Sequence, residues 1–242
     1  AELDPDSDGS GCCDDQAEDL LLGPNGAGKT STLRMLCGLL VPTQGSVRVC
    51  GHDVWTDAKA AKARLGYLDE EPIVYPNLTG REFLQLVADL YGVERGPERE
   101  IQFTRLFDLF ESTEKADELI RSYRHGARQK VVLASVRIHE PEVMLLDEPT
   151  NGLDPRAARR VKDLLQEFAA HGRTVVLSTH ILEIAQALCD RVAIMDRGRV
   201  VAVGTLEELR SGVGSSEASL EELFLQLIGG VESKAMIDQL MR

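Results

Sequence analysis

Long apolar runs are missing from this chain of 242 residues, since no window approaches the roughly 18 consecutive apolar residues of a membrane-spanning helix. The first residues also lack the basic and apolar segments of a secretion signal. We therefore expect neither a membrane span nor a secretory leader. Any contact with a membrane then has to come through a partner.

Positive charge is also scarce, because 27 Lys and Arg stand against 40 Asp and Glu, for a net charge of −13. Affinity for nucleic-acid backbones comes mainly from Lys and Arg, so this balance argues against a nucleic-acid partner. The five cysteines lack the spacing of zinc ligands, and a chain long enough to bury a substantial core has no need of disulfides. A reduced, cytoplasmic setting is therefore expected.

A phosphate-loop sequence is present without a mismatch, because residues 23–30 read Gly-Pro-Asn-Gly-Ala-Gly-Lys-Thr. The apolar run 20–22 predicts a strand before it, and the spacing of leucines predicts a helix over 31–40. The glycines let backbone N–H groups face phosphate oxygens, and the helix N-terminus adds partial positive charge. Lys29 can reach the β- and γ-phosphates and assist catalysis, and Thr30 is placed to ligate Mg²⁺. The predicted nucleotide-binding residues here are Gly23, Pro24, Asn25, Gly26, Ala27, Gly28, Lys29, Thr30 and Ser31.

Two carboxylates end a second apolar strand, which reads Val-Met-Leu-Leu-Asp-Glu over residues 143–148. A buried strand of this kind delivers its last side chains to the carboxyl edge of a parallel sheet, where ligands bind. Asp147 is therefore predicted to hold Mg²⁺, and Glu148 to accept a proton from the attacking water. A third strand, 174–178, is followed by His180, for which a γ-phosphate contact is predicted although a lone histidine is usually structural or exposed.

Together these motifs resemble those of the ATP-binding cassette (ABC) ATPases, from about Leu20 to the C-terminus. Residues 148–154 are similar to the family's junction between Walker B and the D-loop, and residues 178–180 to its switch histidine. Residues 123–130 align with its signature sequence, and residues 66–72 with its Q-loop. The resemblance implies a P-loop NTPase (RecA-like) α/β fold, with a parallel sheet core and an inserted helical subdomain. It adds Glu70, Arg124, Gly126 and Asp154 to the nucleotide-binding residues, with Glu70 also as a ligand of Mg²⁺.

Within the family, the chain is most similar to the exporters of the ABC-2 type, in which an ATPase pairs with a separate membrane permease. The resemblance implies ATP and Mg²⁺ as cofactors, ATP hydrolysis that powers export, and a cytoplasmic location on the inner face of the membrane through the permease. It also implies a homodimer, in which each phosphate loop faces the signature of the second ABC ATPase subunit. Two alternatives stay open: a catalytically impaired or truncated nucleotide-binding remnant, and a soluble non-transport ABC ATPase.

The N-terminus departs from the family pattern. Relatives place two or three β-strands and an adenine-stacking aromatic before the phosphate loop, whereas residues 1–19 contain eight acids and no Lys, Arg or aromatic. Such a composition cannot bury enough apolar surface to order itself. We therefore predict a disordered segment at 1–19 and expect the N-terminal antiparallel strands to be missing.

The remainder, 20–242, is predicted to form one ABC ATPase domain. Its parts are a nucleotide-binding core at 20–70 and 141–210, a helical subdomain at 71–140 and C-terminal helices at 211–242. A short strand within 45–51 is expected in a small antiparallel layer. Helices are predicted at 79–90, 97–110, 128–138, 206–210 and 220–228 from apolar spacing and start signals.

Two motif positions also depart from the family. Glu70 stands where the Q-loop usually has Gln; a carboxylate can still ligate Mg²⁺, but it adds negative charge and cannot donate a hydrogen bond when ionised. Arg124 stands where the signature usually has Ser. Arginine could act as an arginine finger, but it needs far more room than a hydroxyl. We therefore favour impaired closure of the dimer over a new catalytic device.

Overall fold

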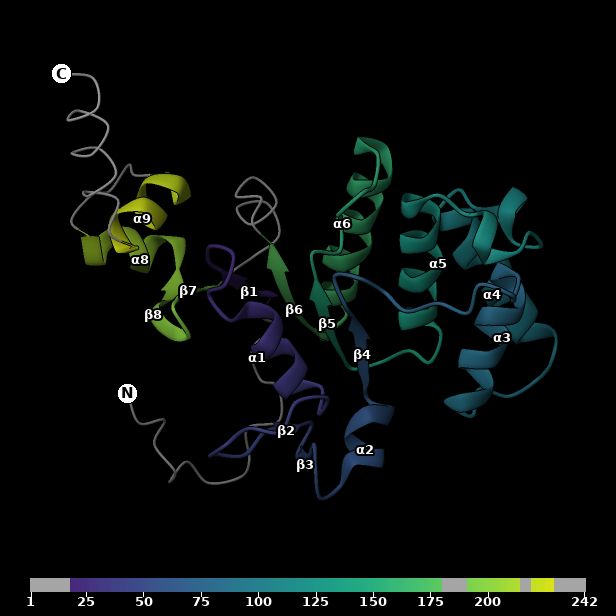
Figure 1. The fold of residues 1–242 in the computed structure, drawn as a ribbon, viewed down its shortest axis with the longest axis horizontal. Helices are drawn as coiled ribbons and strands as arrows, with labels where there is room; N and C mark the ends of the chain where they lie inside the picture. Colours follow the sequence, from purple (N-terminus) through teal and green to yellow (C-terminus); the bar gives the residue numbers. More distant parts are fainter. Residues whose placement is uncertain (1–17, 180–190, 214–218, 229–242) are drawn as a thin grey trace.

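A six-stranded sheet forms the centre of the computed structural model, which describes residues 18–179, 191–213 and 219–228 (Figure 1). The order of the strands is β4-β5-β6-β1-β7-β8, and every neighbouring pair is parallel except β7 and β8. The carboxyl ends of β1, β5 and β6 therefore lie at one edge. The strands are β1 (Glu18–Leu22), β4 (Leu65–Leu68), β5 (Val143–Asp147), β6 (Thr174–Thr179), β7 (Arg191–Asp196) and β8 (Arg199–Thr205).

Both faces of the central strands are buried, as their continuous apolar sequences predict. Because side chains alternate along a strand, Leu20 and Leu22 of β1 pack in one apolar cluster while Leu21 packs in another. The first cluster includes Val161 of helix α6 (Pro155–Ala170), and the second includes Leu33 of helix α1 (Lys29–Leu36). Helices thus cover both faces of the sheet, which leaves the carboxyl edge of its parallel strands as the place for a site.

The predicted boundary between the disordered segment and the first strand is wrong by two residues, because β1 begins at Glu18 rather than at Leu20. Glu18 and Asp19 pair with Val175 and Val176 of β6, so sheet pairing extends the strand into the acidic stretch. Residues 1–17 lie outside the described residues, where the disordered segment and the missing strands stay predictions. The predicted small antiparallel layer is confirmed as the pair β2 (Arg48–Val49) and β3 (His52–Asp53), followed by helix α2 (Ala58–Ala63).

A helical lobe lies between β4 and β5 in the sequence and beside the sheet in space (Figure 1). The first of its helices starts with a capping box, in which Thr79 Oγ1 accepts from the Glu82 N–H and a Glu82 carboxylate oxygen accepts from the Thr79 N–H. Aromatic side chains, Phe83, Phe103 and Phe107, fill its interior. Its helices are α3 (Gly80–Leu90), α4 (Pro97–Leu109) and α5 (His125–Arg137), with short 3₁₀ turns η1 (Thr113–Lys115) and η2 (Ile120–Ser122).

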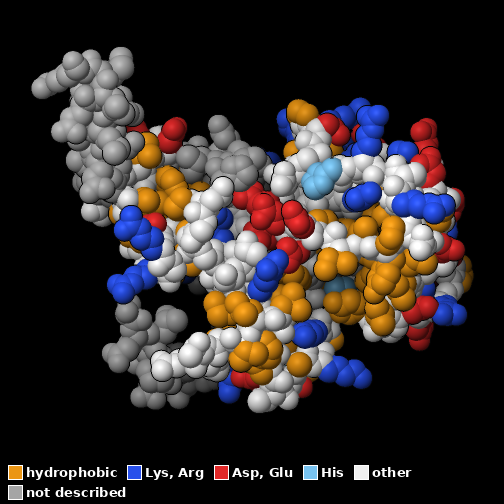
Figure 2. All heavy atoms as spheres, viewed as in Figure 1, with side chains coloured by type: hydrophobic (Ala, Val, Ile, Leu, Met, Phe, Trp, Pro, Cys, Tyr) orange, Lys and Arg blue, Asp and Glu red, His pale blue; other side chains and the backbone are white. Residues whose placement is uncertain are grey.

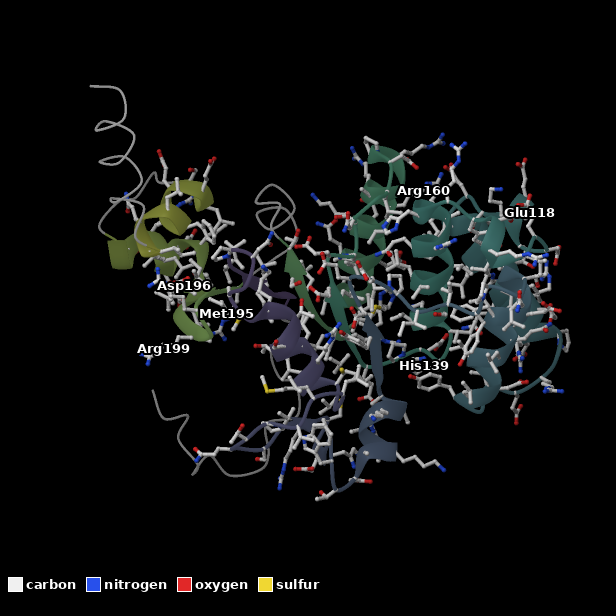
Figure 3. The ribbon with its side chains drawn as sticks, in the orientation of Figure 1. Glu118, His139, Arg160, Met195, Asp196 and Arg199 are labelled. Carbon is white, nitrogen blue, oxygen red and sulfur yellow. The ribbon has the colours of Figure 1, made fainter. Side chains whose placement is uncertain are left out.

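Two contacts tie the lobe to the sheet. Arg160 of α6, labelled in Figure 3, donates to the Leu109 carbonyl over 2.9 Å and pairs with Glu111 over 2.5 Å. His139, after α5, lies 3.1 Å from the Leu65 carbonyl through Nε2, and its ring stacks on Tyr91 with centroids 3.7 Å apart. These contacts fix the lobe relative to β4 and α6.

Helix boundaries differ from the predictions at particular places. The helix after the phosphate loop is predicted at 31–40, but α1 begins at Lys29 and ends at Leu36. The predicted start of α5 at Arg128 is three residues late, because Arg124 takes the extended N-cap conformation and the helix begins at His125. Helix α6 was not predicted, although Asp154 caps its Ala157 N–H and Pro155 takes its first position.

Beyond the sheet lie α8 (Leu206–Val213) and α9 (Leu220–Leu227). Within the described residues, every helix is too short or too polar to cross a bilayer.

Candidate nucleotide-binding site

The phosphate loop connects β1 to α1 at the carboxyl edge of the sheet. Gly28 caps α1 at a φ of 103°, a left-handed conformation that side chains disfavour. The first turn of α1 contains no acidic residue, so no carboxylate of the helix itself offsets the partial positive charge of its N-terminus. The N-terminus of α1 is therefore suited to bind an anion.

The end of β7 and the turn that follows it contact the loop. A Cβ at Gly23 would lie only 2.5 Å from the carbonyl oxygen of Met195, which is labelled in Figure 3, so only glycine fits there. The Gly198 N–H donates to the Ala27 carbonyl over 2.9 Å. The path of the loop is thus set by a segment far away in the sequence.

Lys29 is buried, with 8% of its surface exposed, and its ammonium lies over the loop. Its Nζ donates to the carbonyl of Gly23 over 2.7 Å and to that of Pro24 over 3.3 Å. A flexible, mostly desolvated cation held beside a helix N-terminus is suited to a phosphate.

Asp147 ends β5 and is 1% exposed. One carboxylate oxygen accepts a hydrogen bond from Ser178 Oγ, at the facing position of β6. The other, Oδ2, is buried and has no hydrogen-bond partner among the described residues. An unpaired buried carboxylate oxygen is costly, and carboxylate oxygen is the ligand that Mg²⁺ prefers. The residue therefore fits its predicted role as a metal ligand.

Glu148 follows Asp147 and is 6% exposed. Its φ of 47° is uncommon for a residue with a side chain, and such backbone strain gathers at functional sites. Its N–H donates to the Ser178 carbonyl over 3.0 Å, and Thr179 Oγ1 donates to its Oε2 over 3.1 Å. The carboxylate is thus held in place by β6 at the sheet edge.

These groups meet in a cavity of about 660 Å³. Figure 2 shows acidic side chains gathered in the middle of the molecule, where β5 ends in Figure 1. Among the described residues that line it, one cation, Lys29, stands against three carboxylates, so a triphosphate would meet net repulsion unless a divalent cation came with it. The lining residues are Asn25, Gly26, Ala27, Gly28, Lys29, Thr30, Ser31, Glu70, Asp147 and Glu148.

The predicted signature residues lie in a second cluster, apart from this cavity. Arg124 is exposed at the N-cap of α5 and makes no side-chain cap hydrogen bond. Gly126 approaches Gly152, the Gln129 amide donates to Pro149 over 3.4 Å, and Lys130 Nζ lies 3.9 Å from an Asp154 oxygen. The pKa of Asp154 is lowered, chiefly by the hydrogen bond from the Ala157 N–H. Arg124, Gly126 and Asp154 do not line the cavity.

Sequence reasoning gave no separate role to Ser178 and Thr179, whose hydroxyls donate to the carboxylates of Asp147 and Glu148. Their position at the end of the strand beside β5 could have indicated it, because parallel neighbours end at the same edge. His180 lies outside the described residues, so its phosphate contact stays a prediction.

Comparison with known proteins gives consistent matches. The family model described as "ABC transporter" matches residues 13–151, and a model of an AAA domain matches residues 129–185. The daunorubicin resistance ATP-binding protein DrrA3 of Streptomyces coeruleorubidus is 42% identical over 196 residues, covering 80% of this chain and 61% of the relative. The Nod factor export ATP-binding protein I of Ralstonia nicotianae is 37% identical over 189 residues, covering 78% and 59%. The chain thus spans about three fifths of the length of these relatives.

Solved structures confirm the predicted P-loop fold. A structure described as the ATP-binding subunit of an ABC transporter has a TM-score of 0.84 and 33% identity, covering 88% of each chain. A dimeric ATP-binding cassette bound to ADP and Pi, at 24% identity and a TM-score of 0.73, shares the fold over 79% of this chain and 86% of its own. Because the family model covers more than half of the sequence and this geometry accompanies it, the chain belongs to the ABC transporter family.

Proposed function

We propose that the chain binds ATP with Mg²⁺ and hydrolyses it, powering export through a separate membrane permease. The observation that carries this proposal is the cavity in which the phosphate loop, Lys29, Asp147 and Glu148 meet. Relatives named for drug resistance and for Nod factor export support the transport of a substrate out of the cell. Release of phosphate from ATP by the purified chain tests the enzymatic part directly.

In this mechanism the loop N–H groups and Lys29 hold the β- and γ-phosphates. Thr30, Asp147 and Glu70 would hold Mg²⁺, which neutralises charge on the phosphates when it is bound. Glu148 takes the proton of a water that attacks the γ-phosphate in line, and its contact with Thr179 keeps the carboxylate oriented. His180 is proposed to contact the same phosphate.

A second ABC ATPase subunit would complete this site. In one chain the cavity lacks the signature residues, which sit with the 149–154 turn in their own cluster. A homodimer in which each signature faces the other phosphate loop brings Arg124, Gly126 and Asp154 to the nucleotide. We therefore propose that ATP closes such a dimer and that hydrolysis opens it.

Arg124 decides how well this dimer closes. We expect Arg124→Ser to raise both ATP turnover and MgATP-dependent dimerisation, because a bulky guanidinium at the exposed N-cap is replaced by a small hydroxyl. Phosphate release and light scattering with MgATP measure the two effects. A fall in turnover would instead identify an arginine finger, whose loss typically costs about 10³ to 10⁵ in rate.

The control for this variant has to separate closure from helix stability. Serine is a preferred N-cap residue, so Arg124→Ser should also stabilise α5 by about 0.5 to 2 kcal/mol. Arg124→Ala removes the guanidinium without adding a preferred cap, and Arg121→Ser removes an exposed arginine three residues earlier. A gain of turnover that is absent from Arg124→Ala, or that Arg121→Ser shares, would contradict a specific block at position 124.

The permease is proposed to contact the helical lobe. Ile73 is 92% exposed and Tyr75 is 57% exposed. Both lie in the segment that follows Glu70, so a partner bound there can respond to the presence of the γ-phosphate. Figure 2 shows hydrophobic side chains gathered over the lobe near α3. Exposed apolar side chains of this kind are candidate anchors in a partner's groove.

Ile73→Asp should reduce co-purification with a permease encoded beside this chain by about tenfold or more, since an apolar anchor becomes a buried charge in the complex. Nucleotide binding should be unchanged, because the side chain is exposed in the free chain. Leu225→Asp, on α9 and 49% exposed, is the matched control. Loss of folding in the Ile73 variant would show that the segment packs within the lobe instead.

A further inference from the structure

Asp69, in the loop after β4, accepts hydrogen bonds from three residues. The Arg34 guanidinium donates to both of its carboxylate oxygens, with Nε and Nη2 each 3.1 Å away. Tyr67 Oη donates over 2.9 Å, and the Glu71 N–H lies 3.4 Å from Oδ1. Burial, and next the hydrogen bond to Asp69, raises the pKa of Tyr67, so its hydroxyl remains a donor. Bidentate pairing of this kind fixes direction as well as distance.

The cluster joins two parts of the nucleotide cavity. Arg34 lies one helical turn after Thr30 on α1, and Asp69 directly precedes Glu70, which lines the cavity. No described residue hydrogen-bonds to the Glu70 carboxylate or pairs with it. The Arg34–Asp69 pair therefore links the segment that carries Glu70 to the helix that carries Thr30.

We propose that Asp69, held by Arg34 and Tyr67, is a positioning residue that keeps Glu70 in the cavity with Thr30 and Asp147, the other proposed ligands of Mg²⁺. This inference rests on the proposed function and deepens it, because it says how an exposed acid serves a divalent cation. A loop fixed in its binding conformation loses less entropy when the cation binds. Positioning of Glu70 therefore strengthens nucleotide binding only when the cation is present, since Glu70 repels the phosphates when the cation is absent.

The test measures how much Mg²⁺ strengthens nucleotide binding. A non-hydrolysable ATP analogue, adenylyl imidodiphosphate, is titrated onto the full chain in excess Mg²⁺ and in EDTA, and the ratio of the two affinities is the Mg²⁺ gain. We expect Asp69→Ala to lower this gain by about threefold to tenfold, with affinity in EDTA unchanged within about twofold. Asp69→Asn keeps the shape of the side chain and should shift the gain in the same direction if the alanine variant does not fold.

Two combinations separate positioning from a general loss of structure. Arg34→Ala should reduce the gain as Asp69→Ala does, and the double variant should add little, because the two residues act as one unit. In a Glu70→Ala background, Asp69→Ala should have no further effect. Arg64→Ala is the matched control, since it removes an exposed pair with Glu142 at the opposite end of β4.

The outcomes distinguish this inference from the function beneath it. A Mg²⁺ gain that stays at the wild-type level in Asp69→Ala would overturn the positioning role and leave the proposed function intact. Equal weakening in Mg²⁺ and in EDTA would overturn it as well, because it would show a distorted α1. The absence of any Mg²⁺ gain in the wild-type chain would contradict the proposed function, and the positioning role with it.

Discussion

Lys29→Ala is expected to abolish measurable MgATP binding. The side chain brings the only cation among the described residues that line the cavity, against three carboxylates. Hydrogen bonds to charged groups contribute about 1.5 to 3 kcal/mol each, so losing contacts to two phosphates should weaken binding by about a hundredfold or more. Equilibrium titration with a non-hydrolysable analogue in Mg²⁺ measures the effect.

The control for Lys29→Ala has to account for the loop. In the structure Lys29 also donates to the carbonyls of Gly23 and Pro24, so its removal can loosen the loop itself. Thermal unfolding without nucleotide reports that part of the effect. Lys59→Ala removes an exposed lysine from α2 and should leave affinity unchanged. Wild-type affinity in the Lys29 variant would remove the assigned phosphate contact.

Glu148→Gln is expected to keep nucleotide binding while turnover falls by about 10² to 10⁴, the usual contribution of a general base. Glutamine keeps the shape of the side chain, and its amide oxygen can still accept from Thr179. The variant loses the capacity to take a proton from water. Single-turnover phosphate release, measured beside analogue binding, separates the two steps.

The matched control for this variant flanks the same strand. Glu142→Gln changes an exposed acid just before β5, whereas Glu148 lies just past its end, so net charge changes equally in both variants. Only the Glu148 variant should lose turnover. If Glu148→Gln retained full turnover, another group would have to be the base.

Local patterns predict the sheet edge and its main side chains. The apolar runs at 20–22 and 143–146 have to be buried strands, and the residues after parallel strands reach a common edge of the sheet. The sequence alone therefore indicates a shared site, and the structure brings its predicted members to one cavity, namely Lys29, Thr30, Glu70, Asp147 and Glu148. Their chemical roles stay proposals.

Contacts between distant segments could not be predicted in this way. The bond from Thr179 to Glu148 depends on strand register, and the Arg34 pairing with Asp69 depends on how α1 lies against the loop after β4. Helix α6 was missed although Asp154 and Pro155 carry a start signal, because the motif assigns those residues to a functional turn. Tertiary packing supplied the information that spacing alone lacks.

Steady-state release of phosphate from ATP by the purified wild-type chain tests the central claim most directly. The account predicts phosphate release that requires Mg²⁺, stops on addition of EDTA and is lost in both Lys29→Ala and Glu148→Gln. Release that is absent from a folded wild-type chain, or equal in the wild type and the two variants, would contradict it.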